Sequence, residues 1–270
     1  MHASHKILGI RFDNLTLKEA ASLLGQYIQE GRFHYVATPA LHRVVYARRK
    51  NKIRKIYADA DLNLSDGIAI IWASRILGVG LKERIPCPDL LSEIFKLSVN
   101  KGYRISILRG GDEGVTRKSI EGIRKKYPGI NICGAYTMPY DFEPTAESPI
   151  NSNLIEQILQ GKPQVLIFAL GCPKEEEWLW GTKPKLQEIP LCLGVGGALE
   201  IYAGRIRRAP KWMQSTGLEW VFRLTEEPLR LYKRYLVDGI LFLWFLSLEV
   251  LKKLFSQGCS RRPNSHQNPE

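Results

Sequence analysis

The sequence predicts an α/β fold, a Rossmann-like and mostly parallel β-sheet flanked by helices, with a helical C-terminal appendage. Short apolar runs alternate with longer segments of helical periodicity, which is the pattern of βαβ units. That alternation stops near Gly204, and the chain from there to Phe255 is basic, aromatic and helical in propensity. The predicted organisation is therefore a Rossmann-like domain over 1–204, the appendage over 205–258 and a disordered tail over 259–270.

The predicted strands are short and apolar, as expected for strands that are buried on both faces of a parallel sheet. They are Ile7–Ile10, Phe33–Ala37, Leu62–Leu64, Arg104–Leu108, Ile130–Gly134, Val165–Ala169 and Leu191–Val195. The predicted helices are Leu17–Gln29, Leu41–Ala58, Ile68–Leu77, Asp89–Asn100, Gly114–Tyr127, Asn151–Gln160 and Glu175–Gln187. The segment Met138–Pro149 is rich in proline and acidic residues, which predicts a surface loop.

The composition of the chain favours anionic partners but does not identify which one. The 270 residues include 39 Lys and Arg against 27 Asp and Glu, a net charge of +12. Such a surplus favours anionic partners such as phosphates, nucleic acid or an acidic membrane face. The five cysteines are scattered without CxxC spacing, which argues against a zinc site or a disulfide framework and suits a reducing cytosol.

No segment has the pattern of a membrane span. The N-terminus lacks the apolar core of a signal peptide, and no window reaches the roughly 18 apolar residues of a transmembrane helix. Val237–Phe255 is strongly apolar and is flanked by basic pairs at 233–234 and 252–253, which is typical of a segment lying in an anionic membrane interface. A buried docking helix or an oligomer contact would show the same pattern, so both interpretations stay open.

Polar residues and glycines follow several predicted strands, where open α/β sheets bind their ligands. Thr38 and Asp66 each follow a strand, as do the turns Gly171–Lys174 and Gly194–Gly197. Asp66 could simply cap the next helix, and glycines after strands are often only turns. Gly194–Gly197 could instead cradle a phosphate at a helix start, although it lacks the full GxGxxG spacing of a dinucleotide site.

The C-terminal run GRIRRAPKWMQSTGLEWVFRLTEEPLRLYKRYL resembles the signature of the WecG/TagA/CpsF glycosyltransferases, glycosyltransferase family 26. The resemblance includes TPALHRVVYARR, ADLNLSDGIAIIWASRILG, LGCPKEEEW and LGVGGALEIYAG, and covers roughly residues 7 to 245. It implies an inverting enzyme that moves N-acetylmannosamine or a related sugar from UDP to a sugar on a polyprenyl diphosphate carrier. It also implies that no metal or other cofactor is needed.

By position in this resemblance, Asp66 corresponds to the proposed general base and Thr38 to a threonine beside the acceptor. The chemistry agrees, because an inverting transfer needs one base to take the proton of the attacking hydroxyl. Without a metal, fixed cations and N–H dipoles must stabilise the departing UDP. The residues predicted to bind the donor or its diphosphate are Arg208, Arg223, Arg230, Gly171, Lys174, Glu175, Gly194, Gly196, Gly197 and Glu200.

The sequence departs from the family pattern at three places. Ala40 replaces an asparagine, Glu175 replaces a glutamine, and Cys87 replaces a glycine. A carboxylate at Glu175 would repel a nearby diphosphate unless it contacts a sugar hydroxyl or Lys174. These changes bear on the sugar and leave a different donor open, such as UDP-glucose or a UDP-uronic acid.

Two other functional classes compete with this reading. The glycine-rich turns could belong to a Rossmann-type oxidoreductase, and the positive charge could belong to a non-enzymatic module that binds membrane or nucleic acid. A recognised nucleic-acid motif is missing, so nucleic acid is not an expected partner. The expected partners are a UDP-sugar, a polyprenyl-diphosphate-linked sugar and an anionic membrane surface, with a homo-oligomer left open. The expected location is cytoplasmic, on the inner face of the cell membrane.

Overall fold

The computed structural model describes residues 2–144 and 149–259, except for the side chains at 149, 230, 233, 234 and 256–259. A six-stranded, all-parallel sheet in the order β4-β3-β8-β7-β5-β6 forms its centre. The strands are β3 (His34–Ala37), β4 (Leu62–Asn63), β5 (Arg104–Gly110), β6 (Asn131–Met138), β7 (Val165–Ala169) and β8 (Leu191–Gly194). The predicted α/β class with a parallel sheet is confirmed.

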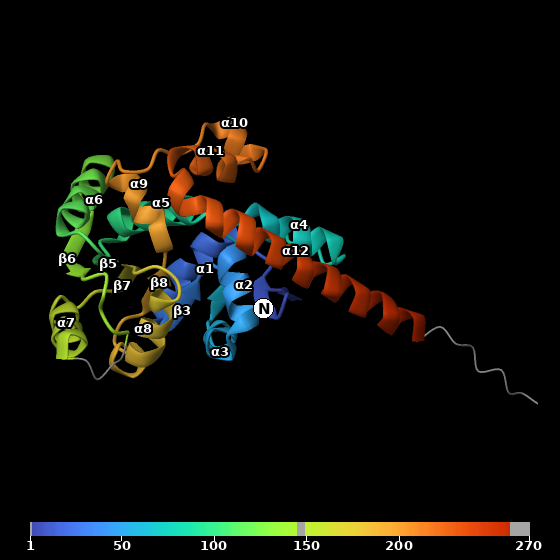
Figure 1. Cartoon of the computed structure of the whole chain (residues 1–270). Coiled ribbons are helices and arrows are strands. Elements are labelled where there is room, and N and C mark those ends of the chain that lie inside the picture. Colours follow the sequence, from blue (N-terminus) through green and yellow to red (C-terminus); the bar gives the residue numbers. More distant parts are fainter. Residues whose placement is uncertain (1, 145–148, 260–270) are drawn as a thin grey trace, which may run out of the picture.

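Helices cover both faces of the sheet (Figure 1). One face packs against α1 (Leu17–Glu30), α5 (Cys87–Lys101) and α6 (Glu113–Lys126). The other packs against α2 (Leu41–Arg49), α3 (Asn51–Ala58), α7 (Pro149–Gln160) and α8 (Lys174–Thr182). In β8, Leu191 and Leu193 join the first core and Cys192 the second, so alternate side chains serve opposite faces. Strands sandwiched in this way need apolar residues throughout, which explains the apolar runs of the sequence.

The predicted strand Ile7–Ile10 is wrong. These residues form the turn of an antiparallel hairpin, β1 (Ser4–Ile7) and β2 (Ile10–Asp13), which is separate from the six-stranded sheet. Leu8 and Gly9 have φ angles of 50° and 88°. A two-residue turn with positive φ at both positions matches the twist of antiparallel strands, and it is easily missed when an apolar residue occupies the first position.

Two predicted helices are interrupted. The segment Leu41–Ala58 divides into α2 and α3, because Lys50 between them is extended at φ −127° and ψ 106°. The segment Glu175–Gln187 ends as an α-helix at Thr182 and continues as a 3₁₀ turn over Lys183–Lys185. Pro184 within that turn has no N–H to continue an α-helical ladder, which accounts for the change.

The appendage follows α9 (Leu199–Tyr202) and consists of α10 (Lys211–Ser215), α11 (Glu219–Glu226) and α12 (Pro228–Cys259). The helix α4 (Ile68–Ile76) lies beside the long α12, which continues past the body of the protein (Figure 1). No helix in the described ranges is both long enough and apolar enough to span a bilayer. The disordered tail is predicted over 259–270, but Cys259 is instead the last residue of α12, and 260–270 lie outside the described residues.

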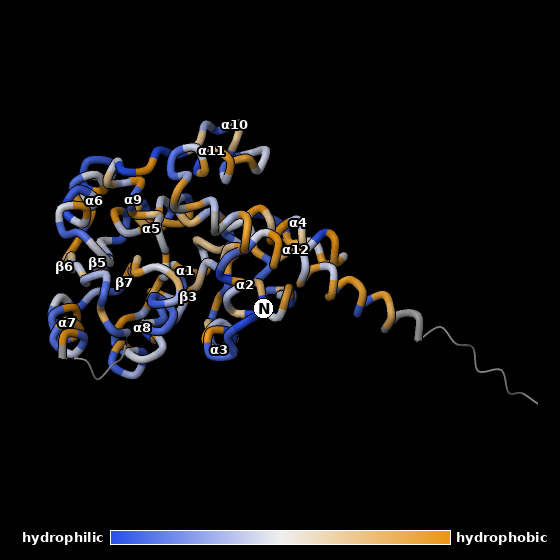
Figure 2. The backbone as a smooth tube through the Cα atoms, viewed as in Figure 1, coloured by the Kyte–Doolittle hydropathy of each residue, from blue (hydrophilic) through white to orange (hydrophobic). Residues whose placement is uncertain are grey.

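The helix α12 has one face on the protein and one face in solvent. Phe242 and Leu246 are buried in the core that also holds α2. Glu249 accepts a hydrogen bond from the Leu8 N–H at 3.2 Å, and the Lys253 ammonium donates to the Leu77 carbonyl at 2.5 Å. Figure 2 shows apolar stretches along the same helix out to its far end. The sequence left membrane contact and docking as alternatives, and the structure shows docking of one face.

Candidate active site

The carboxyl ends of three adjacent strands form the centre of the site. Thr38 follows β3, Asp66 follows β4, and Gly194–Gly197, hereafter the glycine turn, begins at the last residue of β8. The strand β3 lies between the other two. The Thr38 hydroxyl donates to the Gly194 carbonyl at 3.0 Å, which joins the end of β3 to the end of β8. Cys87 links Asp66 to Thr38, because its backbone N–H contacts Asp66 and its thiol contacts Thr38.

The Asp66 carboxylate does not cap α4. That helix begins at Ile68 with Gly67 at its N-cap and has no side-chain cap. Instead, Asp66 accepts a hydrogen bond at 2.8 Å from the backbone N–H of Cys87, the first residue of α5. The Cys87 thiol in turn interacts with the Thr38 hydroxyl. A carboxylate at a helix N-terminus is favourably placed, and here it is held close to a neutral hydroxyl.

The environment of Asp66 raises the pKa of its carboxyl group above the ordinary value. Burial of the carboxyl is the largest influence, because a charged group is poorly solvated there. The Cys87 N–H opposes this shift, followed by the positive charges of Arg223 and Arg84. A carboxylate with a raised pKa is a stronger base, as general-base catalysis requires.

The appendage packs over the segment that carries Asp66. Gly217, between α10 and α11, has a φ of 78°, and a Cβ added there would lie 2.7 Å from Cγ1 of Ile68. Arg84 donates to Glu219 of α11 at 2.9 Å. Arg208 makes two hydrogen bonds of 2.5 Å to the carboxylate of Asp89 in α5. These contacts hold α10 and α11 against the start of α4 and α5.

Of the three predicted arginines, the structure brings Arg223 to the glycine turn. Its Nη2 atom lies 3.9 Å from the position that a Cβ on Gly197 would take. Its Nε is buried and has no hydrogen-bond partner among the described atoms. Arg208 is instead paired with Asp89, and the side chain of Arg230 lies outside the described residues. Arg223 is thus a partly exposed cation whose buried Nε has unused hydrogen-bonding capacity beside the turn.

Other predicted donor-binding residues have partners within the protein. The Lys174 ammonium donates to the carbonyls of Tyr140 and Phe142 at 2.5 and 3.2 Å. Glu200 forms ion pairs with Arg109 at the end of β5 and, at 3.6 Å, with Arg205. Gly171 has a φ of 78° with open space beside it. Gly171 and Lys174 follow β7 and Glu200 lies in α9 after β8, while Thr38 and Asp66 follow β3 and β4.

Sequence reasoning missed three residues of the site, Arg43, Arg84 and Cys87. Glu175 is 1% exposed and pairs with Arg43 instead of Lys174. Arg84 contributes positive potential at Asp66, and Cys87 supplies the N–H that Asp66 accepts. Arg43 and Arg84 look like ordinary helix and loop cations in the sequence. Cys87 departs from the glycine of the family pattern, and this departure is the signal in the sequence that could have pointed to it.

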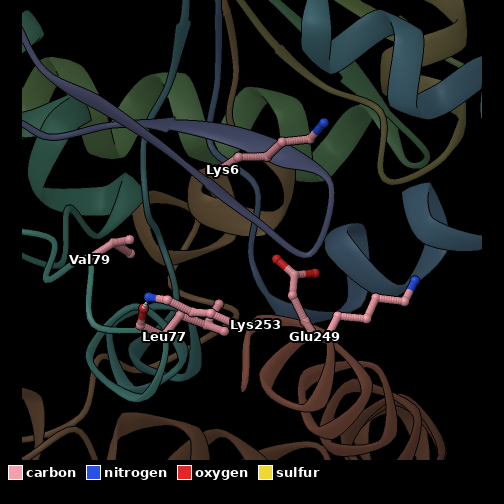
Figure 3. A pocket seen from close by; sticks show the side chains of 6 residues that line it. Lys6, Leu77, Val79, Glu249 and Lys253 are labelled. Carbon is pink, nitrogen blue, oxygen red and sulfur yellow. Dashed lines mark hydrogen bonds between the residues drawn. The ribbon is translucent and has the colours of Figure 1, made fainter. Parts of the chain in front are cut away.

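The groove under the C-terminal half of α12 is a different feature. It encloses about 420 Å³ between β1, the end of α4 and α12, as Figure 3 shows for Lys6, Leu77 and Glu249. No described residue of the predicted site lines it. Within 2–144 and 149–259, three or more His, Cys, Asp or Glu side chains do not gather into a candidate metal site. The prediction that transfer needs no metal stays a prediction.

Known proteins share this sequence over most of its length. The model of the glycosyl transferase WecG/TagA/CpsF family matches residues 5–256. An N-acetylglucosaminyldiphosphoundecaprenol N-acetyl-beta-D-mannosaminyltransferase of Staphylococcus aureus (strain NCTC 8325 / PS 47) is 28% identical over 80% of this chain and 82% of its own. A protein of the same name from Bacillus subtilis (strain 168) is 30% identical over 74% of each chain.

The ion pairs of Arg84 and Arg208 are expected to fasten α10 and α11 to the sheet domain. We expect Arg84→Met with Arg208→Met to speed hydrogen exchange across residues 205–226 while the strands stay protected, because each change leaves a half-buried carboxylate unpaired. Arg205→Met is the matched control, since its one ion pair is at 3.6 Å and its side chain is 53% exposed. Equal exchange in the double variant and the control would contradict this assignment.

Proposed function

The chain belongs to the WecG/TagA/CpsF family of glycosyltransferases, and on that premise we propose that it transfers an N-acetylmannosamine-type sugar from UDP to a polyprenyl-diphosphate-linked sugar. The names of the two relatives support this acceptor and this sugar. The observation that carries the proposal is the position of Asp66 and Thr38 at adjacent strand ends, next to Arg223 of the appendage. The product would serve a cell-envelope polysaccharide or teichoic acid.

Asp66 is the proposed general base. The hydroxyl oxygen of the acceptor sugar forms a bond to the anomeric carbon of the donor while its proton passes to the Asp66 carboxylate. The bond from the anomeric carbon to the UDP oxygen breaks, and UDP leaves with the electron pair, which inverts the anomeric centre. Thr38 donates its proton to Gly194, so its oxygen keeps lone pairs that can accept from a second hydroxyl of the acceptor sugar and orient that sugar.

Arg223 is the proposed cation for the departing diphosphate. A guanidinium group can bind two phosphate oxygens at once, and one that is already in place requires no rearrangement as charge develops. Arg84 and Arg223 both bias Asp66 toward its charged form, while burial biases it toward the neutral form. The site therefore combines an anion-stabilising side near the glycine turn with a base of raised pKa. A base for the acceptor and a separate cation for the departing diphosphate are what a transfer without a metal needs.

The outer face of α12 is proposed to rest on the inner face of the cell membrane, where a polyprenyl carrier resides. Ile240, Leu243 and Trp244 are 60–66% exposed on this face, and Trp72 and Ile76 of α4 are exposed beside α12. Apolar side chains on a helix flanked by lysines are typical of interfacial binding. The same helix follows α11, so membrane contact would bring the lipid carrier near the site.

Asp66→Asn tests the base. An amide cannot accept the hydroxyl proton, so we expect transfer to fall about 100-fold or more while UDP still binds. The rate of transfer is measured as UDP release with a short-chain prenyl-diphosphate-N-acetylglucosamine acceptor. In the wild type, kcat/KM should fall as the pH drops through the Asp66 pKa, and that acid limb should lie above the range of an ordinary aspartate because burial raises this pKa. Near-normal turnover in the variant excludes Asp66 as base.

Arg223→Met tests the diphosphate contact. We expect UDP to bind at least tenfold more weakly, since a charge-assisted hydrogen bond contributes about 1.5–3 kcal/mol. Titration calorimetry with UDP provides the measurement. Lys211→Met removes a positive charge from the exposed surface of α10 and should leave UDP affinity within twofold. Equal weakening in both variants would mean that only overall charge attracts the nucleotide.

The outer face of α12 can be tested without disturbing its docked face. The double change Ile240→Gln and Trp244→Gln should weaken binding to phosphatidylglycerol vesicles at least tenfold, because each side chain contributes about 1.5–3 kcal/mol when buried. Co-sedimentation measures binding, and the melting temperature should not fall, since both residues are exposed. Ser247→Gln, on an exposed position of the same helix, is the control. Unchanged sedimentation of the double variant refutes the membrane assignment.

A further inference from the structure

A fully buried charge network lies behind the glycine turn. Arg43 of α2 and the neighbouring residues Glu175 and Glu176 of α8 are 4%, 1% and 0% exposed. Arg43 Nη2 donates to Glu175 Oε1 at 2.6 Å, and Nη1 donates to Glu176 Oε1. The Tyr57 hydroxyl also donates to Glu176 Oε1, at 2.6 Å. Burying these charges costs free energy, which their mutual hydrogen bonds offset in part.

The two carboxylates have different contacts. Glu175 Oε2 accepts from the backbone N–H of Gly196 at 3.0 Å and from that of Leu170 at 3.3 Å. It therefore joins the end of β7 to the glycine turn after β8. The hydrogen bonds of Glu176 run to the side chains of Arg43 and Tyr57 and, among the described residues, include no backbone N–H of the turn. Equal burial with different contacts makes the two residues a natural comparison.

The glycine turn is pressed against this network. A Cβ added to Gly194 would lie 2.8 Å from Glu175 Oε1, and one added to Gly196 would lie 2.9 Å from Arg43 Nη2. A Cβ on Gly197 would instead point toward Arg223, at 3.9 Å. The inner glycines therefore face the network and the last glycine faces the arginine. The side chains of Glu175 and Arg43 therefore pack directly against the turn.

We propose that Glu175, held by Arg43, is a positioning residue that fixes the glycine turn for the donor diphosphate, an inference that rests on the proposed function. Glu175 already occupies the N–H of Gly196, so the diphosphate binds on the Gly197 side, next to Arg223. Arg43 pairs with both Glu175 and Glu176 and offsets part of their charge, which lowers the repulsion between the nucleotide and a carboxylate in place of the family's glutamine. Glu175 thus acts on the substrate through the backbone of the turn.

The test compares Glu175→Leu with Glu176→Leu. The two changes remove the same charge from equally buried positions, and each leaves Arg43 with one carboxylate partner. Any long-range effect of charge on UDP is therefore matched. Glu175→Leu alone removes the acceptor of the Gly196 N–H. We expect it to weaken UDP binding at least tenfold by calorimetry and to speed hydrogen exchange of residues 192–199. Glu176→Leu should change UDP affinity less than threefold.

Glu175→Gln supplies the rescue, because its amide oxygen can still accept from Gly196. It should recover most of the affinity and exchange protection that Glu175→Leu loses. Equal losses in the Glu175→Leu and Glu176→Leu variants would overturn the proposal. If the leucine variants do not fold, a tenfold loss of UDP affinity in Glu175→Gln beside normal binding in Glu176→Gln would also overturn it. A wild type that does not bind UDP refutes the proposed function, whereas exchange of the turn still reports on Glu175.

Discussion

The packing of the appendage onto the segment after β4 is the constraint on which the site depends. Asp66 comes from the sheet domain, while Arg223 comes from a helix more than 150 residues later in the chain. They influence each other only because Gly217 fits against Ile68 and because Arg84 and Arg208 find carboxylates across the boundary. A side chain at Gly217 would force these surfaces apart. The site is therefore shared between two parts of the molecule.

Several arginines around this site serve the structure. Arg43, Arg109 and Arg208 each hold a carboxylate. A surplus of arginines in the sequence thus overstates the cations that are available to a substrate. Arg223 differs, because the described residues offer its guanidinium no carboxylate partner and its Nε is buried without a hydrogen bond there. Leaving such a group unpaired is unfavourable in an isolated protein, and an anionic ligand would relieve that cost.

The two faces of α12 are compatible with both interpretations of Val237–Phe255, docking on the protein and contact with a membrane. Its inner face supplies Phe242 and Leu246 to the core, and Glu249 reaches back to the N-terminal hairpin. Its outer face exposes Trp244 and other large apolar side chains. A helix that is apolar almost all round can serve protein on one side and lipid on the other. Membrane contact at the outer face would then be transmitted to α11 through a short connection.

The sequence by itself determined the α/β class, most elements and the family, because apolar period, strand-end glycines and the Arg208–Tyr235 run are local patterns. It also placed Thr38 and Asp66 at strand ends, which the parallel sheet brings together. Only the tertiary structure decided which charges meet. Glu175 meets Arg43 across 132 positions, and Arg208 meets Asp89 across 119. Such pairs depend on how helices pack, and no local pattern encodes that distance.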